Sequence, residues 1–412
     1  MAFFLVNIIG ALLFWGGKAG LLQLIYSINE SVASFTFIPL MLFILMGSLL
    51  FHSGIALNTI DALDKWMGRV PGRLGLVAVA SGVLIGTLSG SSMASGAILG
   101  SALTPEMERR GYKKTMSLGP ILGSGGLALL IPPSAVSVLV AALAETSVAD
   151  VLIGGVIPGI IMAMLYAGYI IIKCWLDPSV APPYEVTRVP FSEKAFHFMK
   201  YVLPLGLVIF LVTGVIFFGI ATPSEAAATG ALGSLILAVC YGRLSWPAIQ
   251  KTFIETLKIT IMMFIIISSA VAFGQILAFS GATAGLTHFL TGLPVHPIMV
   301  VIILQIILVV LGMFAGHVPI IMVVVPLFIP IIKSFGMSPV WFCLLLILNI
   351  EMGATSPPFG FNIFVIKAVA PKDTTMGDIY RAALPYLYCD AVVMALMLAF
   401  PAIVLWLPGM MS

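Results

Sequence analysis

Residues 346–362 read Leu-Ile-Leu-Asn-Ile-Glu-Met-Gly-Ala-Thr-Ser-Pro-Pro-Phe-Gly-Phe-Asn, and this stretch decides how the rest of the chain is interpreted. Apolar runs at 341–348 and 363–370 flank it and are together long enough to cross a bilayer. Its middle cannot be ordinary helix, because Pro357 and Pro358 remove two backbone donors and disfavour helical conformation just before them. Unpaired backbone groups are tolerated at membrane depth only where they are buried in protein or line a polar cavity. The stretch therefore predicts a broken helix that forms an ion or substrate site of a secondary transporter.

The composition of the whole chain supports a membrane location. Hydrophobic residues make up 61% and charged residues only 8%, with a mean hydropathy of +1.17, which excludes an ordinary soluble domain. The net charge of +3 does not indicate nucleic-acid binding. The four cysteines lack CxxC spacing, so we expect inert buried thiols without disulfide or metal roles. The start lacks a basic leader and a clear cleavage site, so a retained first helix is expected, with a first helix trimmed at its start as the alternative.

Apolar runs of about 20 residues predict membrane spans. They lie at 3–29, 35–57, 115–143, 151–174, 201–220, 222–242, 259–279, 339–369 and 382–407. Two longer runs, 74–103 and 297–332, are interrupted by small or helix-breaking residues around 86–96 and 312–319, and we interpret both as re-entrant hairpins. The proline-containing stretch 177–200, with mixed charge, predicts a soluble linker.

The distribution of basic residues tests this topology. With two hairpins, one face receives all 19 lysines and arginines except Lys333, which lies on the opposite face, and Lys18, which lies inside the first run. Treating the first long run as a straight crossing would scatter the basic clusters over both faces. The positive-inside rule therefore places the basic face in the cytoplasm and the C-terminus outside.

The chain also repeats itself at an offset of 225 residues. Pro132 and Pro357 are separated by 357−132 = 225, and the same offset relates Pro133 to Pro358, Pro105 to Pro330 and Gly111 to Gly336. Five predicted crossings precede the second copy, and an odd number inverts it. Inverted repeats with paired broken helices bind substrate near the middle of the membrane.

The first predicted hairpin tip is rich in hydroxyl groups. Residues 88–96 read Leu-Ser-Gly-Ser-Ser-Met-Ala-Ser-Gly, and by analogy with the second half this tip faces Gly123-Ser-Gly-Gly before Pro132-Pro133-Ser134. Neutral oxygens of this kind suit Na⁺. The alternative is that small residues only allow close helix packing. We favour a functional role, because the small residues gather at the predicted breaks rather than along a helix face.

The second half supplies two titratable candidates. His317, at the second tip, could bind an anionic group or a proton, but we prefer a neutral histidine that is hydrogen-bonded to backbone. Glu351 is an intramembrane carboxylate and so a functional candidate. A structural hydrogen bond to the amides of the opposing tip explains Glu351 equally well. Thr222 and Glu225 flank Pro223 in the pattern of a helix-capping box, and we assign them that structural role.

At these residues the chain resembles the large membrane subunit (DctM-like) of TRAP, or tripartite ATP-independent periplasmic, transporters of the ion-transporter superfamily. The resemblance rests on Ser89-Gly-Ser-Ser-Met-Ala-Ser-Gly-Ala-Ile-Leu-Gly-Ser-Ala-Leu-Thr-Pro-Glu-Met, Ile131-Pro-Pro-Ser, Ile157-Pro-Gly, Ala221-Thr-Pro-Ser-Glu-Ala-Ala-Ala and Thr355-Ser-Pro-Pro-Phe-Gly-Phe-Asn. It covers about residues 35–400. The chain departs from the family at Ala315-Gly316 and Met93-Ala94-Ser95, where the family often carries an acidic residue.

The resemblance implies an elevator-type, Na⁺-driven importer of organic anions in the bacterial inner membrane. Its expected partners are a small four-helix membrane subunit, a periplasmic substrate-binding protein, the organic anion and the bilayer. The family's cation sites match positions 89–95, 123–126, 312–317 and 353–358. The expected cation ligands are Ser89, Gly90, Ser91, Ser92, Ser95, Ser124, Gly125, Gly126, Gly312, Ala315, Gly316, Gly353, Thr355 and Ser356. The expected substrate-binding residues are Ser91, Ser92, Pro132, Pro133, Ser134, His317, Asn349, Glu351, Pro357, Pro358 and Asn362.

We therefore expect an all-α polytopic membrane protein with two inverted repeats, a transport domain and a scaffold. The expected parts are scaffold helices of the first repeat (1–73), a first hairpin and broken helix (74–143), a scaffold helix and cytoplasmic linker (144–200), linking and scaffold helices of the second repeat (201–296), a second hairpin and broken helix (297–370) and a C-terminal scaffold helix (371–412). Na⁺ is the only expected cofactor. A stand-alone Na⁺- or H⁺-coupled organic anion carrier is the alternative. An intramembrane enzyme is not expected, because the chain has neither paired aspartates nor HExxH.

Overall fold

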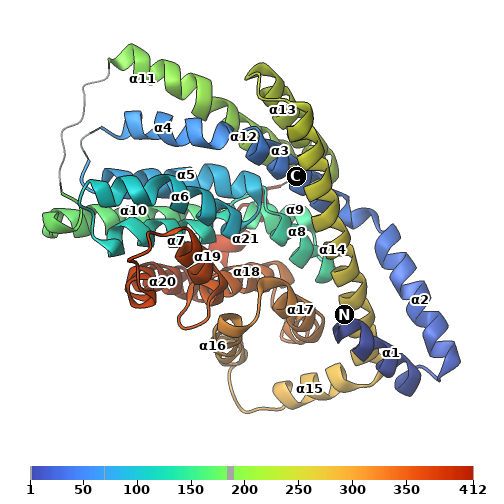
Figure 1. The fold of residues 1–412 in the computed structure, drawn as a ribbon. Coiled ribbons are helices and arrows are strands. Elements are labelled where there is room, and N and C mark those ends of the chain that lie inside the picture. Colours follow the sequence, from blue (N-terminus) through green and yellow to red (C-terminus); the bar gives the residue numbers. More distant parts are fainter. Residues whose placement is uncertain (1, 69, 183–189, 412) are drawn as a thin grey trace.

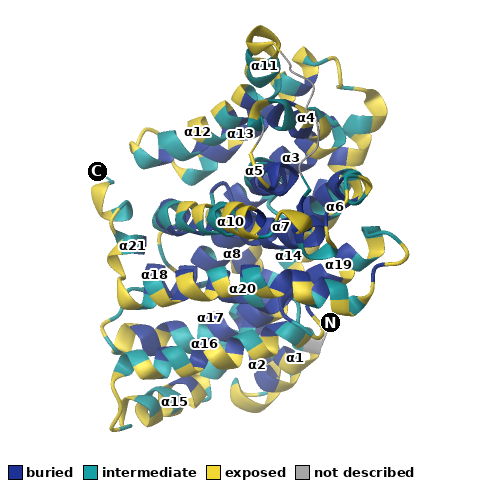
Figure 2. Cartoon of the chain, turned by 90° about the vertical axis from the view of Figure 1, so that its left-hand side faces the viewer, coloured by how far each residue is buried: buried dark blue, intermediate teal, exposed yellow. Residues whose placement is uncertain are grey.

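The computed structural model describes residues 2–68, 70–182 and 190–411, and the regular structure in these ranges is helical (Figure 1). Eight of the described helices are long and apolar enough to cross a membrane, or up to nine if the bent pair at 114–143 is one span. Large apolar side chains are exposed around the outside of the molecule, as lipid-facing surfaces require (Figure 2). The predicted class of an all-helical, multi-span membrane protein is confirmed.

The helices of the first half begin at the N-terminus and end before the linker. They are α1 (Ala2–Phe14), α2 (Lys18–Ala33), α3 (Ile38–His52), α4 (Ile55–Met67), α5 (Arg73–Ser89), α6 (Ser92–Arg109), α7 (Lys114–Leu130), α8 (Ala135–Leu143), α9 (Val148–Gly154) and α10 (Val156–Leu176). The second half contains α11 (Phe191–His197), α12 (Leu203–Phe217), α13 (Pro223–Cys240), α14 (Trp246–Phe279), α15 (Ala282–Thr291), α16 (Pro297–Phe314), α17 (His317–Ser334), α18 (Pro339–Thr355), α19 (Phe361–Val369), α20 (Met376–Ala399) and α21 (Ala402–Leu405).

The helix boundaries repeat at the offset found in the sequence. Adding 225 to the bounds of α6 (92–109) gives 317–334, the bounds of α17. The same addition to α7 (114–130) gives 339–355, the bounds of α18. The two-residue turns before α6 and α17, at 90–91 and 315–316, also correspond. Each half therefore contains the same succession of a helical hairpin and a broken helix.

At both positions where a re-entrant hairpin was expected, the chain forms two helices joined by a short turn. The chain reverses between α5 and α6 at Gly90, whose φ of +61° is readily adopted only by glycine. The two arms pack together, since a Cβ atom on Gly86 of α5 would lie 3.6 Å from Ser95 Oγ of α6. In the second half, α16 and α17 lie side by side in both views (Figures 1 and 2).

Both helices expected to break at Pro-Pro do so. The axes of α7 and α8 are bent by 47° across residues 131–134, and Ser134 caps α8 by accepting a hydrogen bond from the Ser137 amide at 3.3 Å. The second break separates α18, which ends at Thr355, from α19, which begins at Phe361. Both Pro-Pro peptide bonds are cis.

The first expected span is wrong. Residues 3–29 form two helices. Gly16 and Gly17 adopt φ values of +83° and +69°, which interrupt the helix between Phe14 and Lys18. The two helices pack closely, since a Cβ atom on Gly20 would lie 2.2 Å from the Ala11 carbonyl oxygen. Both pack on α14. Lys18, which hydropathy did not place, is exposed at the start of α2.

Other expected boundaries also need correction. The linker is shorter than 177–200, because helix begins at Phe191 and continues through a π-helical turn into α12, while residues 183–189 of the expected linker lie outside the described residues. The 382–407 run is not one helix, since α20 ends before Pro401 and α21 follows. The α14 helix begins at Trp246, well before 259, while the capping box of Thr222 and Glu225 is confirmed. Cys174 and Cys343 are buried, but Cys389 is partly buried and Cys240 is exposed.

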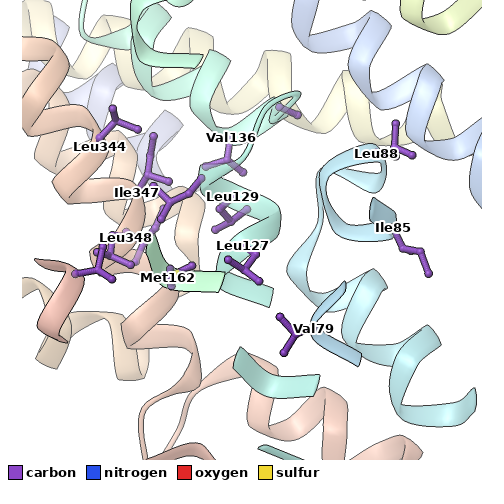
Figure 3. Close-up of a cluster of buried hydrophobic side chains, with 14 of the residues drawn as sticks. Val79, Ile85, Leu88, Leu127, Leu129, Val136, Met162, Leu344, Ile347 and Leu348 are labelled. Carbon is purple, nitrogen blue, oxygen red and sulfur yellow. The ribbon is translucent and has the colours of Figure 1, made fainter. Parts of the chain in front are cut away.

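The centre of the molecule is built from α7 and α18, the long arms of the two broken helices. Their apolar side chains meet those of α5, α8 and α10 in one buried cluster, in which Leu129, Met162 and Ile347 lie close together (Figure 3). The halves also interlock, because α6 packs on α19 and α17 packs on α8. In each case the helix after a hairpin tip contacts the helix after the break of the other half. Both tips and both breaks are therefore held in one body.

Candidate functional site

A cavity of about 390 Å³ lies where the two hairpin tips approach α3 and α14. The first tip contributes residues 89–94 and the second contributes 316–319. The opposite wall comes from Ile44, Gly47, Ser48 and Phe51 of α3 and from Glu255, Ile259, Met262 and Met263 of α14; Leu129, Ala135, Val136 and Phe361 complete the lining. The cavity thus brings together both tips that the sequence singled out, although they are far apart along the chain.

The first tip presents the start of α6 to this cavity. Ser91 caps α6, its Oγ accepting a hydrogen bond from the Ala94 amide at 3.2 Å. Ser89 Oγ donates to the Gly86 carbonyl oxygen at 3.1 Å, which fixes the end of α5. Ser89, Gly90, Ser91 and Ser92 all line the cavity, as predicted. The tip therefore offers hydroxyl and carbonyl oxygens beside the amides of a helix N-terminus, a combination that can hold a cation and an anionic group next to each other.

Directly behind the first tip lies the buried carboxylate of Glu351, which is only 1% exposed. Its Oε1 accepts a hydrogen bond from Asn362 Nδ2 at 2.7 Å, and Asn362 Nδ2 lies 3.4 Å from Ser92 Oγ. Gly125 leaves room for the carboxylate, since a Cβ atom there would lie 2.8 Å from Glu351 Oε1. Three of the expected substrate-binding residues, Ser92, Glu351 and Asn362, therefore form one buried polar cluster, of which only Ser92 lines the cavity.

The second tip reaches the same cluster through His317. This residue begins α17, lines the cavity and is 9% exposed. Its Nε2 lies 3.7 Å from Glu351 Oε2. Neither of these two atoms has a hydrogen-bond partner among the described residues. His317 therefore stands between the cavity and the carboxylate, rather than bonding to backbone as the preferred interpretation held.

Several other expected ligands do not line the cavity. Ser124 donates to the Ile121 carbonyl oxygen at 2.8 Å and packs against Gly82, where a Cβ atom would lie 2.2 Å from Ser124 Cβ. Thr355 Oγ1 donates to the Glu351 carbonyl oxygen at 3.0 Å. Similar bonds to carbonyl oxygens of their own helices occupy Ser95 and Ser356. The hydroxyl groups of these small polar residues are therefore bonded to backbone in this structure, outside the cavity wall.

The backbone positions expected as ligands divide in the same way. Gly316 lines the cavity, whereas Gly126 packs against Glu351 and Ala315 lies beside the apolar core. Gly312 and Gly353 pack against each other, since a Cβ atom on Gly312 would lie 2.9 Å from Gly353 Cα. The role of this pair is the close approach of α16 to α18.

Six expected substrate-binding residues also lie outside the cavity wall. Asn349 Nδ2 donates to the backbone and side-chain oxygens of Gln305 on α16, at 2.8 and 2.7 Å. Pro132 and Pro133 are buried at the first break, Pro357 is partly buried and Pro358 is exposed. The carbonyl oxygen of Pro358 accepts a hydrogen bond from Tyr380 OH at 2.8 Å. Ser134 is buried as the cap of α8. These residues lie at or near the breaks, whereas the cavity is lined by the tips.

Two polar clusters near the site were missed. Ser48 Oγ donates to Glu255 Oε2 at 3.1 Å, and His52 Nε2 lies 3.4 Å from the same oxygen, so α3 and α14 are joined in the cavity wall. Behind Glu351, Tyr166 OH donates to the buried carboxylate of Asp390 on α20. The rule that identified Glu351, a carboxylate within an apolar run, also applies to Asp390. No comparable signal marks Glu255, because it precedes the predicted start of its span.

Comparison with known proteins places these features in a family. A family model described as the DctM component of the tripartite ATP-independent periplasmic transporter matches residues 1–403. A large permease protein of a C4-dicarboxylate TRAP transporter from Pseudomonas aeruginosa is 32% identical over 381 residues, covering 92% of this chain and 88% of that protein. A large permease protein of an ectoine/5-hydroxyectoine TRAP transporter from Ruegeria pomeroyi is 27% identical, covering 97% of this chain and 92% of that protein.

Among solved structures, the fold is similar to that of the YdaH transporter of Alcanivorax borkumensis. The TM-score is 0.65 at 14% sequence identity, and the match covers 94% of this chain and 89% of that one. At this identity the similarity concerns the fold alone. It supports the arrangement of multiple spans with a bent pair described above.

Proposed function

Because this chain belongs to the DctM-component family of tripartite ATP-independent periplasmic transporters, we propose that it imports a small organic anion, of the carboxylate or sugar-acid type, delivered by a periplasmic binding protein. The chain is the large permease component of such a transporter and is not an enzyme. The substrates named for its relatives, C4-dicarboxylates in one and ectoine in another, are small solutes that carry carboxylate groups.

One observation carries this proposal: two helix N-termini meet at the same cavity. Ser92 is the first residue of α6, His317 is the first residue of α17, and both line the cavity of about 390 Å³. The free amides and the positive dipole end of a helix N-terminus favour an anionic group. The volume lies within the range of about 300–1,000 Å³ that small-molecule sites commonly have. Each half of the protein therefore contributes one helix N-terminus that can bind a carboxylate group of the substrate.

We assign the coupling ion as Na⁺, held by oxygens of the tips. Hydroxyl and carbonyl oxygens, such as those of Ser89 and Ser91, replace the hydration shell of a monovalent cation without supplying a full charge. A bound cation would favour the substrate anion beside it. Either ion alone would leave an uncompensated charge in a poorly solvated site, which is costly. This mutual dependence is the proposed basis of symport.

Alternating access follows from the arrangement of the repeats. Five predicted spans separate the two hairpins, namely α7–α8, α9–α10, α11–α12, α13 and α14, so hairpins that re-enter the membrane would lie in opposite orientations. The interlocked body of α5–α8 and α16–α19 would move as the transport domain, against a scaffold that includes α3 and α14. A small four-helix membrane subunit would complete the complex.

The orientation proposed from the basic residues also assigns the access state. The cavity is lined by the C-terminal half of α3 and the N-terminal half of α14, the end that carries Lys251 and Lys258. The positive-inside rule places that end in the cytoplasm of a bacterial inner membrane, and the C-terminus in the periplasm. The structure would then correspond to the inward-facing state.

Reconstitution tests this function. The chain and its small membrane subunit are placed in proteoliposomes, and uptake of a labelled C4-dicarboxylate is measured with and without the cognate periplasmic binding protein. Uptake is expected only with the binding protein and an inward Na⁺ gradient. Uptake by the chain alone would contradict the tripartite function and favour a stand-alone carrier. Uptake that an H⁺ gradient drives equally well without Na⁺ would contradict the assigned ion.

A further inference from the structure

One of the places where the two halves of the protein touch contains the carboxyl group of Glu351. Glu351 and Gly126 are equivalent positions, since 351−126 = 225, and they touch: a Cβ atom on Gly126 would lie 3.3 Å from Glu351 Cγ. Ser92 and His317 are also equivalent, since 317−92 = 225, and each begins the helix that follows a tip. Both lie beside the same carboxyl group. Glu351 therefore lies between two equivalent residues, one from the first tip and one from the second.

The side chain of Glu351 fills the space beside two glycines of the first half. A side chain on Gly126 would compete with Glu351 for the same space, and one on the neighbouring Gly125 would lie 2.8 Å from Glu351 Oε1. Where the second half has glutamate, the first half therefore has glycine. The two equivalent hairpins thus share one acidic group, Glu351, which contacts elements of both halves.

The two oxygens of this carboxylate face different tips. Oε1 accepts from Asn362, whose Nδ2 lies 3.4 Å from Ser92 Oγ, so this oxygen is linked to the first tip. Oε2 faces His317 Nε2 of the second tip across 3.7 Å, and neither atom has a partner among the described residues. A hydrogen bond between them requires an approach of roughly 0.8 Å, to the usual separation of about 2.9 Å. A small movement of the second tip would therefore form or break a contact with the group that holds the first.

We propose that Glu351 is a positioning residue that couples the two hairpin tips, so that the conformation of one tip depends on that of the other. This inference rests on the proposed function, in which the tips bind the cation and the substrate. A carboxyl group has two oxygens, so Glu351 can accept a hydrogen bond from the side of each tip. A bound ion that orders the first tip would favour the bonded position of the second, where the substrate carboxylate also lies.

A double-mutant cycle with Na⁺ alone as the probe tests this coupling. Ser92→Ala and His317→Ala are made singly and together in the full chain in lipid nanodiscs, with and without Glu351→Ala. The Na⁺ concentration that gives half of the maximal thermal stabilisation is measured, with choline replacing Na⁺ as the reference. With Glu351 present, the two substitutions are expected to be non-additive by at least about 3-fold, within the range for residues in one network. In the Glu351→Ala background the two substitutions should act independently, so that their fold-changes in this Na⁺ concentration multiply.

Two further variants separate positioning from simple stability. Glu351→Gln keeps the length of the side chain and its acceptor for Asn362, so it is expected to retain most of the non-additivity that Glu351→Ala abolishes. Gln305→Met is the matched control, because it removes a buried polar contact to the same helix, at Asn349, without touching either tip. It is expected to lower the unfolding temperature and to leave the non-additivity intact.

The failures of the inference and of the proposed function are distinguishable. Additive effects of Ser92→Ala and His317→Ala with Glu351 present would overturn the inference. If Na⁺ does not stabilise the unsubstituted protein, the assigned coupling ion is wrong. The cycle is then read from the unfolding temperatures in choline, where non-additivity that depends on Glu351 would still support the coupling and additivity would overturn it.

Discussion

Gly125 shows how a residue without a side chain makes room for its neighbours in the candidate site. It lies in α7, where a Cβ atom would be 2.8 Å from Glu351 Oε1 and 3.1 Å from Ser92 Cβ. Both neighbours are buried, and Glu351 is further held by Asn362. The glycine therefore provides the space in which the carboxylate reaches the first tip. Its value lies in this close approach and not in its backbone freedom, since it sits within a helix.

Gly125→Ala tests this role of space at the residue scale. The added methyl group must displace Glu351 or Ser92, and overpacking of this kind costs about 1–3 kcal/mol. We expect lower thermal stability and strongly reduced uptake in proteoliposomes. Gly168→Ala in α10 is the matched control, because nothing lies within 4 Å of a Cβ atom there. That change should leave uptake intact and leave stability equal or raised by up to about 1 kcal/mol. Normal uptake by Gly125→Ala would refute the close approach.

The surroundings of individual residues were predictable where the side chain had few alternatives. An intramembrane carboxylate must find partners, so Glu351 could be identified from the sequence, and Asn362 lies in the same stretch. Serine and glycine were ambiguous, because close packing and ion binding require the same small side chains. In the structure Ser91 lines the cavity, whereas Ser124 packs against Gly82. No local feature of the sequence distinguishes these two serines, because the difference depends on which residues of other helices lie beside them.

At the scale of elements, the contact between α5 and α7 holds the first hairpin against the broken helix. Gly82 on α5 faces Ser124 on α7, with a Cβ atom on Gly82 lying 2.2 Å from Ser124 Cβ and 3.3 Å from its Cα. In lipid, burial of apolar surface does not drive helices together, so close packing of small residues carries much of their association. The position of the tip depends on this contact.

Gly82→Ala is expected to push the two helices apart and to destabilise the protein by about 1–3 kcal/mol, the usual cost of overpacking. Because the clash is with Ser124, the second substitution Ser124→Gly should restore much of the loss. Thermal unfolding of the two single variants and the double variant measures this. Independent, additive losses in the double variant would show that the two residues are not in contact.

An ion pair links Lys114, at the very start of α7, to Asp373 in the loop before α20, outside the membrane spans. Lys114 Nζ lies 2.6 Å from Asp373 Oδ2, and this hydrogen bond holds the pKa of Asp373 below its usual value. A carboxyl group with a lowered pKa stabilises the folded state above its unfolded-state pKa, and this contribution is lost as the pH falls through the folded-state pKa. Asp373→Asn should therefore lower the unfolding temperature slightly at neutral pH and progressively less in acid. An equal loss at every pH would exclude the ion pair as its cause.

Helix boundaries were predictable where proline interrupts an apolar run, as at both Pro-Pro breaks. They were not predictable where glycine alone ends a helix, because hydropathy does not distinguish a glycine inside a span from one that breaks it. Gly16 and Gly17 divide the first run for this reason. The early starts of α11 and α14 were missed because charged residues lie between those starts and the apolar runs, such as Lys194 in α11 and Lys251 and Lys258 in α14. Hydropathy detects the lipid-facing part of a helix and not the part that extends beyond it.

At the scale of the whole molecule, equivalent elements of the two halves make different contacts. A Cβ atom on Gly47 of α3 would lie 3.0 Å from Ser89 Cα, at the first tip. The equivalent region of α14 faces the far part of the second hairpin instead, where a Cβ atom on Gly274 would lie 2.8 Å from Pro326 Cβ. The offset of 225 was visible in the sequence, but this asymmetry was not. It is what alternating access between two equivalent halves requires.

If each half adopts the contacts that the other half makes in this structure, the contacts of the other access state can be predicted. Subtracting 225 from Gly274 and Pro326 gives Leu49 and Ser101, which should meet when the halves exchange roles. Leu49 is two residues from Gly47, which now faces the first tip, whereas Ser101 lies about ten residues beyond that tip. At 1.5 Å per helical residue, the transport domain would slide by roughly 15 Å. This movement is the central claim of the proposed mechanism.

Paired cysteines test that claim most directly. Gly274→Cys with Pro326→Cys, and Leu49→Cys with Ser101→Cys, are introduced separately into a chain whose four native cysteines are replaced. Each pair is oxidised in proteoliposomes during uptake of a labelled C4-dicarboxylate. The account predicts that both pairs form disulfides, that each disulfide stops uptake, and that reduction restores it. Complete cross-linking of the 274–326 pair with undiminished uptake would contradict the account, because those two residues would then never separate during transport.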